Sequence, residues 1–455
     1  DGRLVAESRH SPGNVSLESD TFEYDDQGHL ISRTDALGNV TGYTYDRLGR
    51  QTAVTAADGS TRRTYYDAEG RPVSEVDALG HRTETAYDRL GRVVQRRAAL
   101  GGQMVVLEAT SYDGAGRVAA STDALGNTTQ FQLDGLGRTT RVTYPDGTVS
   151  TSVYDLLGRV VSRTLPHPSA DPTPPTVTTA YDAVGRTLSV TDPAGHIAAY
   201  QYHADFREAV TQVTAQADAQ ATPVTVLTAV YDSLGRRSSE TREGIAVQFS
   251  YTTDGRPLRT TFADASYTET SYDGRRVTAS RDRAGNVTTY GYDAIGRRTT
   301  VTDARGKSTV TVYAADTSRP TSVTDALGNV TSYEYDPAGR LVRVIHPGSG
   351  TEAERTTLHT YDELGRRTAI DGARTYPLQY GYDLAGRLTA LVDGEGNRTQ
   401  WSFDVAGRLV RKTYADGSHY DYTYDDQGRL LSRTDALGKV TSYVYNDSGQ
   451  VVLVD

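Results

Sequence analysis

Short stretches of alternating residue character recur along the whole chain, each bounded by a turn that contains glycine. In the stretch 330–335, VTSYEY, residues Thr331, Tyr333 and Tyr335 fall on one face of an extended segment, because side chains alternate across a β-strand. No stretch of ten or more residues has the 3.6-residue period of an amphipathic helix. The pattern therefore predicts an all-β fold built from short strands.

The strands belong to a repeat marked by an aromatic residue, once replaced by Leu133, directly before a turn. There are 20 such markers, and 12 of the 19 intervals between them are 21 residues long. A fixed period indicates an array of like units, and 21 residues are too few for a βαβ unit. We expect each unit to be a β-hairpin, so that about twenty hairpins form about forty strands in one continuous antiparallel sheet. Residues 1–455 are expected to form a single array.

Two turn signals alternate within each unit. One is Y-D-x-x-G-R, as at 45–50, and the other is D-x-x-G-N/H/K, as at 35–39. In both, the Asp side chain can accept hydrogen bonds from backbone N–H groups ahead of it, and Gly tolerates a positive φ. We predict that Tyr, Asp, Gly and Arg are the structural turn residues of the repeat. Four representative turns contain Tyr45, Asp46, Gly49, Arg50, Tyr87, Asp88, Gly91, Arg92, Tyr335, Asp336, Gly339, Arg340, Tyr382, Asp383, Gly386 and Arg387.

Four units are longer than the others. Their extra residues lie near 98–106, 165–176, 212–225 and 346–355, each in place of a D-x-x-G-N turn. Because strand direction alternates in an antiparallel sheet, the two turn types lie on opposite edges. We therefore expect all four longer loops to emerge from the same edge.

The composition favours a wall over a compact core. Apolar residues make up 36% of the chain, below the usual ~45–50%, and 31 Tyr outnumber 6 Phe. Tyr combines an apolar ring with a hydroxyl that tolerates water. A sheet of about forty strands twists and cannot be filled by its own side chains. We expect it to spiral into a hollow shell, a partial cocoon, with a compact sandwich as the alternative.

Charge and cysteine content exclude several classes of protein. The net charge is −10, with no basic block, which argues against nucleic acid or an anionic membrane as partner. The chain has no Cys, which excludes disulfides and thiolate zinc sites. No apolar run approaches the ~20 residues of a membrane span.

Candidate chemistry is sparse. The nine His are scattered, and the chain has no GxSxG, HExxH or phosphate-loop motif. The sequences DPAGR at 336–340 and DPAGH at 192–196 lie in register with the repeat, where Pro and Gly are ordinary turn residues. DGEGN at 393–397 has oxygen ligands suited to Ca²⁺, yet its turn position explains its Asp. We expect no metal site, no cofactor and no enzyme activity in this segment.

The repeated pattern YDxxGRxxxxxDxxGxxTxYxYD resembles the Rhs/YD repeat, and the resemblance extends from about Gly13 to Gly449. Such repeats occur in bacterial Rhs proteins, C components of insecticidal Tc toxin complexes, wall-associated bacterial proteins and animal teneurins. The resemblance implies a spiralling β-sheet that encloses a shell, which in the toxin members encapsulates a C-terminal effector. In many bacterial members the shell ends in a self-cleaving module with a DPxGL signature, and neither such a cleavage site nor an effector is visible in this sequence.

These observations lead to a first functional hypothesis: a structural shell segment of a bacterial Rhs-type polymorphic toxin, which sequesters a C-terminal effector until delivery. Its expected partners are the remainder of the same shell, the effector polypeptide, and a secretion-system or toxin-complex component. Such a protein would be made in the bacterial cytoplasm and then secreted or delivered to the cell surface. Because the chain begins and stops inside the repeat pattern, we expect it to be part of a longer shell.

Two other hypotheses stay open. The chain could be an extracellular cell-surface or wall-associated array that serves adhesion or binds carbohydrate, in which case aligned aromatic residues should lie on an outer face or rim. The shell could also host a hydrolase, which would need an Asp pair or a His–acid pair outside the repeat consensus.

Overall fold

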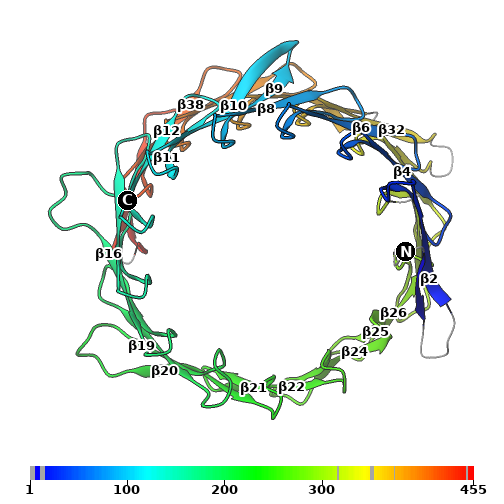
Figure 1. The fold of residues 1–455 in the computed structure, drawn as a ribbon. Coiled ribbons are helices and arrows are strands. Elements are labelled where there is room, and N and C mark those ends of the chain that lie inside the picture. Colours follow the sequence, from blue (N-terminus) through cyan, green and yellow to red (C-terminus); the bar gives the residue numbers. More distant parts are fainter. Residues whose placement is uncertain (1–5, 11–15, 315–316, 349–352, 373–374, 447–448) are drawn as a thin grey trace. The chain divides into compact units, whose positions relative to one another are not determined.

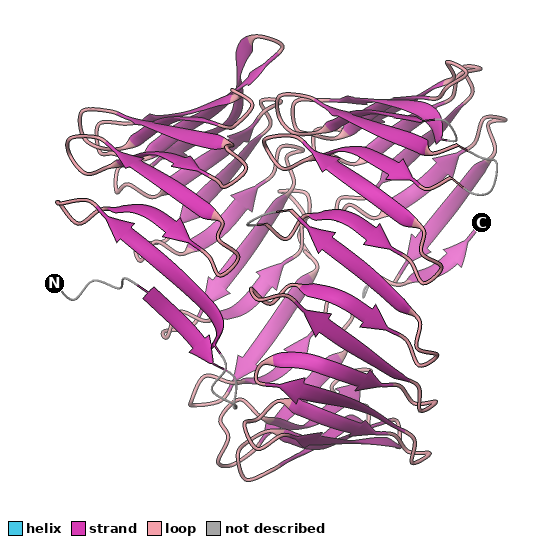
Figure 2. Cartoon of the chain, turned by 90° about the vertical axis from the view of Figure 1, so that its right-hand side faces the viewer, coloured by secondary structure: helices cyan, strands magenta, loops and turns pink. Residues whose placement is uncertain are grey.

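The computed structural model describes residues 6–10, 16–314, 317–348, 353–372, 375–446 and 449–455. These residues form 41 strands, and Figure 2 shows the strands joined by turns and loops. Among them there is no helix long and apolar enough to cross a membrane. The prediction of an all-β fold with about forty strands is confirmed.

The strands follow the repeat closely, and most have five or six residues. Their bounds are β1 (Ala6–His10), β2 (Ser16–Tyr24), β3 (Leu30–Thr34), β4 (Val40–Tyr45), β5 (Gln51–Thr55), β6 (Thr61–Tyr66), β7 (Pro72–Val76), β8 (Arg82–Tyr87), β9 (Val93–Leu100), β10 (Gln103–Tyr112), β11 (Val118–Asp123), β12 (Thr128–Leu133), β13 (Thr139–Thr143), β14 (Val149–Tyr154), β15 (Val160–Thr164), β16 (Thr176–Tyr181), β17 (Thr187–Thr191), β18 (Ile197–Tyr202), β19 (Val210–Gln216), β20 (Val224–Tyr231), β21 (Arg237–Arg242), β22 (Ile245–Tyr251), β23 (Pro257–Thr261), β24 (Tyr267–Asp273), β25 (Arg276–Arg281), β26 (Val287–Tyr292), β27 (Arg298–Thr302), β28 (Ser308–Tyr313), β29 (Pro320–Thr324), β30 (Val330–Tyr335), β31 (Leu341–His346), β32 (Arg355–Tyr361), β33 (Arg367–Gly372), β34 (Thr375–Tyr382), β35 (Leu388–Val392), β36 (Arg398–Phe403), β37 (Leu409–Thr413), β38 (His419–Tyr424), β39 (Leu430–Thr434), β40 (Val440–Tyr445) and β41 (Val451–Val454).

Consecutive strands pair antiparallel in one continuous sheet of hairpins. Between β4 and β5, for example, Tyr43 lies opposite Val54, and the register then shifts by one residue between Thr44 and Tyr45. The same shift precedes the marker aromatic in other hairpins, such as β30–β31 and β38–β39. A β-bulge of this kind re-aims a side chain, and here it lies directly before the Y-D-x-x-G-R turn.

The two turn types lie on opposite edges of the sheet. Y-D-x-x-G-R turns follow even-numbered strands, such as β4 and β6, and we call the edge that they form the Arg edge. D-x-x-G-N turns and their variants follow odd-numbered strands, such as β3 and β11, and form the Asn edge. The four longer connections follow β9, β15, β19 and β31, so all four lie on the Asn edge.

Two of the four segments expected as loops are partly strand. Within 98–106, β9 and β10 continue until only Gly101 and Gly102 remain between them, both with positive φ, which is the geometry of a two-residue hairpin turn. Figure 1 shows this hairpin extending beyond its neighbours. Within 212–225 the irregular part is confined to residues 217–223. Val105 and Val106 in the first segment, and Val and Thr residues in the second, favour continued strand pairing. Residues 349–352 of the fourth segment lie outside the described residues.

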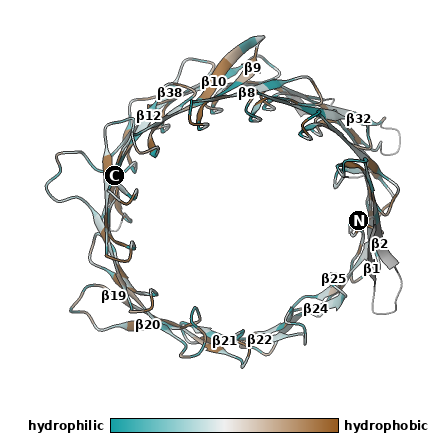
Figure 3. Cartoon of the chain, viewed as in Figure 1, coloured by the Kyte–Doolittle hydropathy of each residue, from teal (hydrophilic) through white to brown (hydrophobic). Residues whose placement is uncertain are grey.

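The sheet is a single layer with little core. Of the described residues, only seven apolar and five polar ones are buried. The accessible surface is 26837 Å², whereas a compact globular chain of this mass would expose about 17,000 Å². Figure 3 shows apolar and polar residues interspersed along the strands. A compact sandwich, which would bury one face of every strand, does not fit these values.

The chain divides into two compact units, and each combines stretches that are distant in the sequence. Unit 1 comprises residues 1–108, 268–381 and 392–396, and unit 2 comprises residues 109–267, 382–391 and 397–455. In unit 2, the connection after β15 folds back on β14, where Val149 and His167 form a β-bridge and are among the most buried residues.

Candidate functional site: the two edges and the facing turns

The Asp of each Y-D-x-x-G-R turn organises that turn. In the turn 45–50, Asp46 Oδ1 accepts hydrogen bonds from the backbone N–H of Leu48 at 2.9 Å and of Arg50 at 3.0 Å. Its Oδ2 accepts from Arg50 Nε at 2.6 Å. The hydrogen bond from the Arg50 side chain, with the backbone bonds, lowers the pKa of Asp46 below its ordinary value. The carboxylate therefore satisfies backbone donors and fixes the guanidinium at the same time.

The Gly of this turn adopts the left-handed conformation that residues with a Cβ rarely enter. The four glycines that the sequence singles out have φ values between 76° and 85°: Gly49, Gly91, Gly339 and Gly386. The backbone N–H of Gly49 also donates to the carbonyl of Asp46 at 3.0 Å, which closes the turn.

The Arg of the turn extends along the edge to the next hairpin. Arg50 Nη1 donates to the backbone carbonyl of Asp67 at 3.1 Å, and its guanidinium lies 4.8 Å from the ring centroid of Tyr66. This combines an ion pair with the hairpin's own Asp and a cation–π contact with the next aromatic residue. The same stacking occurs at Arg71, Arg138, Arg159, Arg186, Arg236, Arg297, Arg340, Arg387, Arg408 and Arg429.

The Tyr hydroxyl points in the opposite direction, toward the preceding hairpin. Tyr66 Oη donates to the carbonyl of Gln51 at 2.8 Å, at the first residue of the preceding odd-numbered strand. Tyr45, Tyr87 and Tyr335 make the equivalent bonds to the carbonyls of Leu30, Pro72 and Pro320, each at 2.9 Å. The Arg and the Tyr of the turn thus join one hairpin to its neighbours, and these contacts recur from turn to turn along the Arg edge.

The sixteen turn residues predicted from the sequence all lie on this edge. Asp88 and Asp383 pair with Arg92 and Arg387 as Asp46 pairs with Arg50. Arg340 pairs with Asp336 and stacks on Tyr361. Tyr382 is the last residue of β34. These residues are distributed along the edge and do not converge on one pocket.

Departures from the consensus keep the same contacts by other means. His29 occupies the Arg position of its turn, and its Nδ1 lies 2.9 Å from Asp25 Oδ2, while its ring stacks on Tyr45 at 4.8 Å. In the degenerate turn after Tyr202, the ring of Phe206 covers the position next to Gly235. Sequence analysis did not identify these substitutes, although the position of His29 five residues after Tyr24 matches that of Arg50 after Tyr45.

The turn 35–39 of the Asn edge bonds within itself. Asp35 accepts from the backbone N–H of Leu37 and Asn39 and from Asn39 Nδ2, all at 2.9–3.0 Å. Asn39 is much shorter than Arg and ends within its own turn. In four turns of this edge the Asp moves to the third position, giving AADGS at 56–60, YPDGT at 144–148, FADAS at 262–266 and YADGS at 414–418.

In unit 1, an Asn-edge turn faces an Arg-edge turn from a distant stretch. Arg319 Nη2 donates to Asp58 Oδ2 at 3.0 Å, although the two residues are 261 positions apart. Arg319 stands in an Arg-edge turn in which Ala314 occupies the place of the usual Asp. Its guanidinium is therefore available for the distant carboxylate. Hydrogen bonds from Ser60 and the ion pair with Arg319 lower the pKa of Asp58.

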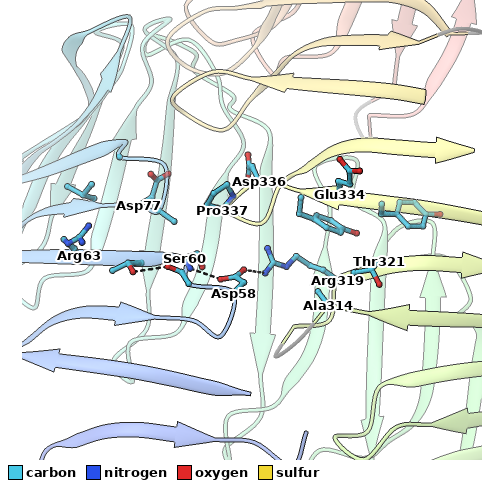
Figure 4. A pocket seen from close by; sticks show the side chains of 17 residues that line it. Asp58, Ser60, Arg63, Asp77, Ala314, Arg319, Thr321, Glu334, Asp336 and Pro337 are labelled. Atoms are coloured by element: carbon cyan, nitrogen blue, oxygen red, sulfur yellow. Dashed lines mark hydrogen bonds and ion pairs between the residues drawn. The ribbon is translucent and has the colours of Figure 1, made fainter. Parts of the chain in front are cut away.

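A cleft of about 750 Å³ lies beside this ion pair, between the turns 56–60 and 77–81 and the turns 314–319 and 336–340. Figure 4 shows Asp58 pointing toward Arg319 across it. Its lining mixes acidic and basic side chains with Tyr333 and Tyr335. Within the described residues, no group of three or more His, Asp or Glu could hold a metal ion. The geometry is that of a contact between two edges.

Unit 2 contains the same arrangement. Arg408 Nη2 lies 3.6 Å from Asp146 Oδ2. Burial raises the pKa of Asp123, but hydrogen bonds within its turn and the charge of Arg387 hold that pKa below its ordinary value. The three pairs of turns have the same separation along the sheet. The Asn-edge turns come directly after β5, β11 and β13, and the Arg-edge turns come directly after β28, β34 and β36. The separation is therefore 23 strands in each pair. The sequence analysis did not predict these pairs, although the displaced Asp of AADGS and YPDGT distinguishes two of the Asn-edge turns from the others.

Solved structures with the same fold come from toxin complexes. The structure titled TcdB2-TccC3-TEV is similar with a TM-score of 0.74 and 14% identity, covering 99% of this chain and 28% of the other. TcdB2-TccC3 without its hypervariable C-terminal region gives a TM-score of 0.67 and 16% identity, with coverage of 98% and 26%. A Tc holotoxin pore from Photorhabdus luminescens gives a TM-score of 0.57 and 14% identity, with coverage of 97% and 29%. This chain therefore spans little more than a quarter of the length of the structures it matches.

No curated protein matches the chain significantly. The family model described as RHS Repeat matches residues 24–61, 66–103, 112–149, 134–167, 181–219, 271–308, 316–352, 379–419 and 424–455, which is more than half of the chain. The chain belongs to the RHS-repeat family.

Proposed function

We propose that this chain is a wall segment of the encapsulating shell of a bacterial Rhs-type polymorphic toxin, and that the shell encloses and sequesters an effector polypeptide. Its role is structural and not catalytic. The observation that carries the proposal is the single-layer sheet, which is continuous from strand to strand and also meets itself edge to edge within each unit.

Confinement needs a wall without openings that a polypeptide could pass. Neighbouring strands of a sheet lie about 4.8 Å apart, which leaves no space for a chain between them. Along the Arg edge, Asp–Arg–Tyr contacts connect each hairpin to the next. Where an Asn edge faces an Arg edge, ion pairs such as Asp58–Arg319 join the two stretches. We propose that residues 1–455 act as a single array of hairpins in this wall. In this proposal the sixteen turn residues make the repeated contacts that hold neighbouring hairpins together.

The faces of the sheet also suit a container. Thr, Ser, Tyr and Arg side chains are half-buried on most strands, and Figure 3 shows polar and apolar residues interspersed along the strands. The polar side chains limit the continuous apolar surface to which an unfolded or partly folded effector could bind. The effector can then be held without being attached.

The similar solved structures are toxin complexes, four of which carry TcdB2 and TccC3 in their titles. By analogy, the partners of this chain are the remainder of the same shell, the effector, and a toxin-complex or secretion-system component. The protein would be made in the bacterial cytoplasm and then secreted or delivered to the cell surface.

One observation favours a second candidate, an extracellular array that binds carbohydrate. Trp401 lies opposite Lys412, and Lys412 lies opposite Tyr420, across the neighbouring strands β36, β37 and β38. Lys412 Nζ is 5.9 Å from the Trp401 ring and 4.6 Å from the Tyr414 ring. Aligned aromatic rings can stack on sugars, but here they surround a cation of the protein itself, which makes this the weaker proposal.

Protease protection tests the encapsulation. In the full-length natural protein that contains this array, the effector should resist added protease as long as the shell is intact, and should be degraded at once when the shell is unfolded by denaturant. An effector that is cleaved as fast within the intact protein as when it is expressed alone would contradict the proposal. Binding of the isolated chain to a glycan array, lost in Trp401→Ala, would support the carbohydrate-binding candidate instead.

A further inference from the structure

The cleft between the facing turns of unit 1 is lined by three residues that depart from the repeat. Arg63 stands three residues before a marker aromatic, and no other of the 20 units has a basic residue at that place. Ala314 directly follows a marker, where most units have Asp and no other unit has an apolar residue. Pro337 is the only Pro that stands two residues after a marker. The three departures come from three different units and meet in one cleft, so the repeat itself does not account for them.

The carboxylates that line the cleft already have hydrogen-bond donors within the chain. Each accepts from an Arg side chain or from backbone N–H groups of its own turn: Asp58 from Arg319, Asp77 from Leu79 and His81, Glu334 from Arg343, and Asp336 from Arg340. Because the chain itself supplies these donors, the acidic side chains of the lining do not need a cationic ligand.

Arg63 is in the opposite situation. It is an exposed residue that lines the cleft, and within the part of the chain that the structure describes no carboxylate or carbonyl accepts a hydrogen bond from its side chain. On the facing wall, Ala314 takes the place of the consensus Asp (Figure 4). Compared with two consensus turns, the cleft thus gains a cation and loses an anion, which favours an anionic ligand. A guanidinium binds a carboxylate through two parallel hydrogen bonds.

Apolar groups make up much of the remaining lining. Val76 lies opposite Arg63 in the pairing of β6 with β7, and Pro337, Tyr333 and Tyr335 line the cleft from the other stretch. The hydroxyl of Tyr335 already donates to a backbone carbonyl of the chain. The cleft of about 750 Å³ lies within the ~300–1,000 Å³ of small-molecule sites, which combine apolar walls with a few polar groups. A ligand that suits this lining has one anionic group and an apolar body.

We propose that this cleft binds a small organic acid. The carboxylate of the ligand pairs with the Arg63 guanidinium, and its apolar body lies against Val76, Pro337 and the ring of Tyr333. The Asp58–Arg319 pair holds the two walls together beside the ligand. This inference goes beyond the structural role of the wall and does not depend on what the wall encloses.

Saturation-transfer NMR on the full-length natural protein that contains this array tests the proposal, with phenylbutyrate as the probe. Phenylbutyrate should bind saturably with a dissociation constant on the order of 1 mM, and high salt should weaken the binding because an ion pair contributes to it. Phenylbutyramide, which has the same body without the charge, should bind about tenfold more weakly. Arg63→Gln should raise the dissociation constant of phenylbutyrate about tenfold, and Ala314→Asp, which restores the consensus carboxylate, about fivefold.

Arg62→Gln is the matched control. Arg62 precedes Arg63 on β6, so its side chain projects from the opposite face of the sheet, where it pairs with Glu75. This variant removes the same charge and should leave the dissociation constant unchanged, and thermal unfolding should show that all three variants are folded. The proposal would be overturned by a protein that does not bind phenylbutyrate, by equal binding of the amide, or by equal losses in the two Arg variants. Binding of the peptide acetyl-Val-Glu-Val-amide about tenfold more tightly than phenylbutyrate would replace the small acid by a polypeptide.

Discussion

The two edges of the sheet begin from the same Asp-Gly turn and differ in one residue at its end. On the Arg edge, Arg50 reaches the next hairpin and contacts both Tyr66 and the carbonyl of Asp67. On the Asn edge, Asn39 bonds only within its own turn to Asp35. The length of one side chain thus decides whether neighbouring hairpins are connected along an edge.

This difference explains where the array tolerates insertion. On the Arg edge, the Arg side chain of one turn packs against the Gly of the next turn. A Cβ added to Gly70 would lie 3.7 Å from Arg50 Nη1. On the Asn edge, a Cβ added to Gly38 or Gly80 would meet no atom within 4 Å. All four longer connections lie on the open edge. An insertion there breaks no contact between hairpins, and the same openness lets an Asn edge receive a distant Arg edge.

The largest effect should come from removing a turn carboxylate on each edge. Asp404→Ala removes acceptors for the backbone N–H and the Nε of Arg408 and frees the Arg from its place over Tyr424. We expect a loss of about 2–3 kcal/mol in the free energy of unfolding. Asp35→Ala on the Asn edge should cost about 1–2 kcal/mol. Urea denaturation measures both, and equal losses would contradict the distinction between the edges.

Adding a methyl group should show the same asymmetry at two neighbouring turns. Both Gly339 and Gly328 have positive φ, so Ala at either should cost about 1 kcal/mol through strain. A Cβ at Gly339 would lie 2.8 Å from Arg319 Nη1, whereas at Gly328 it would meet nothing within 4 Å. Gly339→Ala should therefore cost more, about 1–2 kcal/mol, and should also disturb the Asp58–Arg319 pair. Thermal unfolding measures the stability of both variants. A lower melting temperature for Gly328→Ala than for Gly339→Ala would contradict the expected difference between the edges.

A smaller effect is expected from removing one hydroxyl. Tyr66→Phe loses the bond from Tyr66 Oη to the carbonyl of Gln51 and should cost about 1 kcal/mol. The adjacent Tyr65 is 51% exposed, and Tyr65→Phe is the matched control with an expected change near zero. Similar values for the two variants would show that the hydroxyl contact does not stabilise the Arg edge.

The pH dependence of stability should be the smallest effect near neutrality. Hydrogen bonds from the following Arg side chain lower the pKa values of Asp88, Asp113 and Asp134 below the ordinary 3.8. A carboxyl whose pKa is lower in the folded state stabilises the fold above its unfolded pKa, and this contribution is lost as pH falls through the folded pKa. Melting temperatures should be nearly constant from pH 7 to about pH 5 and should fall below about pH 4. A drop between pH 6 and pH 5 would contradict this assignment.

The sequence predicted the local structure well because the signals are local. The alternation in VTSYEY and the Asp-Gly turns set the strands, the hairpins and the two edges. The extension of β9 and β10 was missed, since Gly101-Gly102 forms a tighter turn than the length of the segment suggested. The pairing of Asp58 with Arg319 could not be predicted, because an offset of 23 strands results from small twists accumulated over every intervening hairpin. No single residue determines this offset.

We propose that this sheet is the wall of a closed container. Cryo-electron microscopy of the full-length natural protein tests it most directly, because it images the wall and its contents together. The account predicts a sealed wall whose coils meet Asn edge to Arg edge, with diffuse density for an effector inside. A wall with no enclosed space, or a sealed wall that is empty while the effector lies outside, would contradict it.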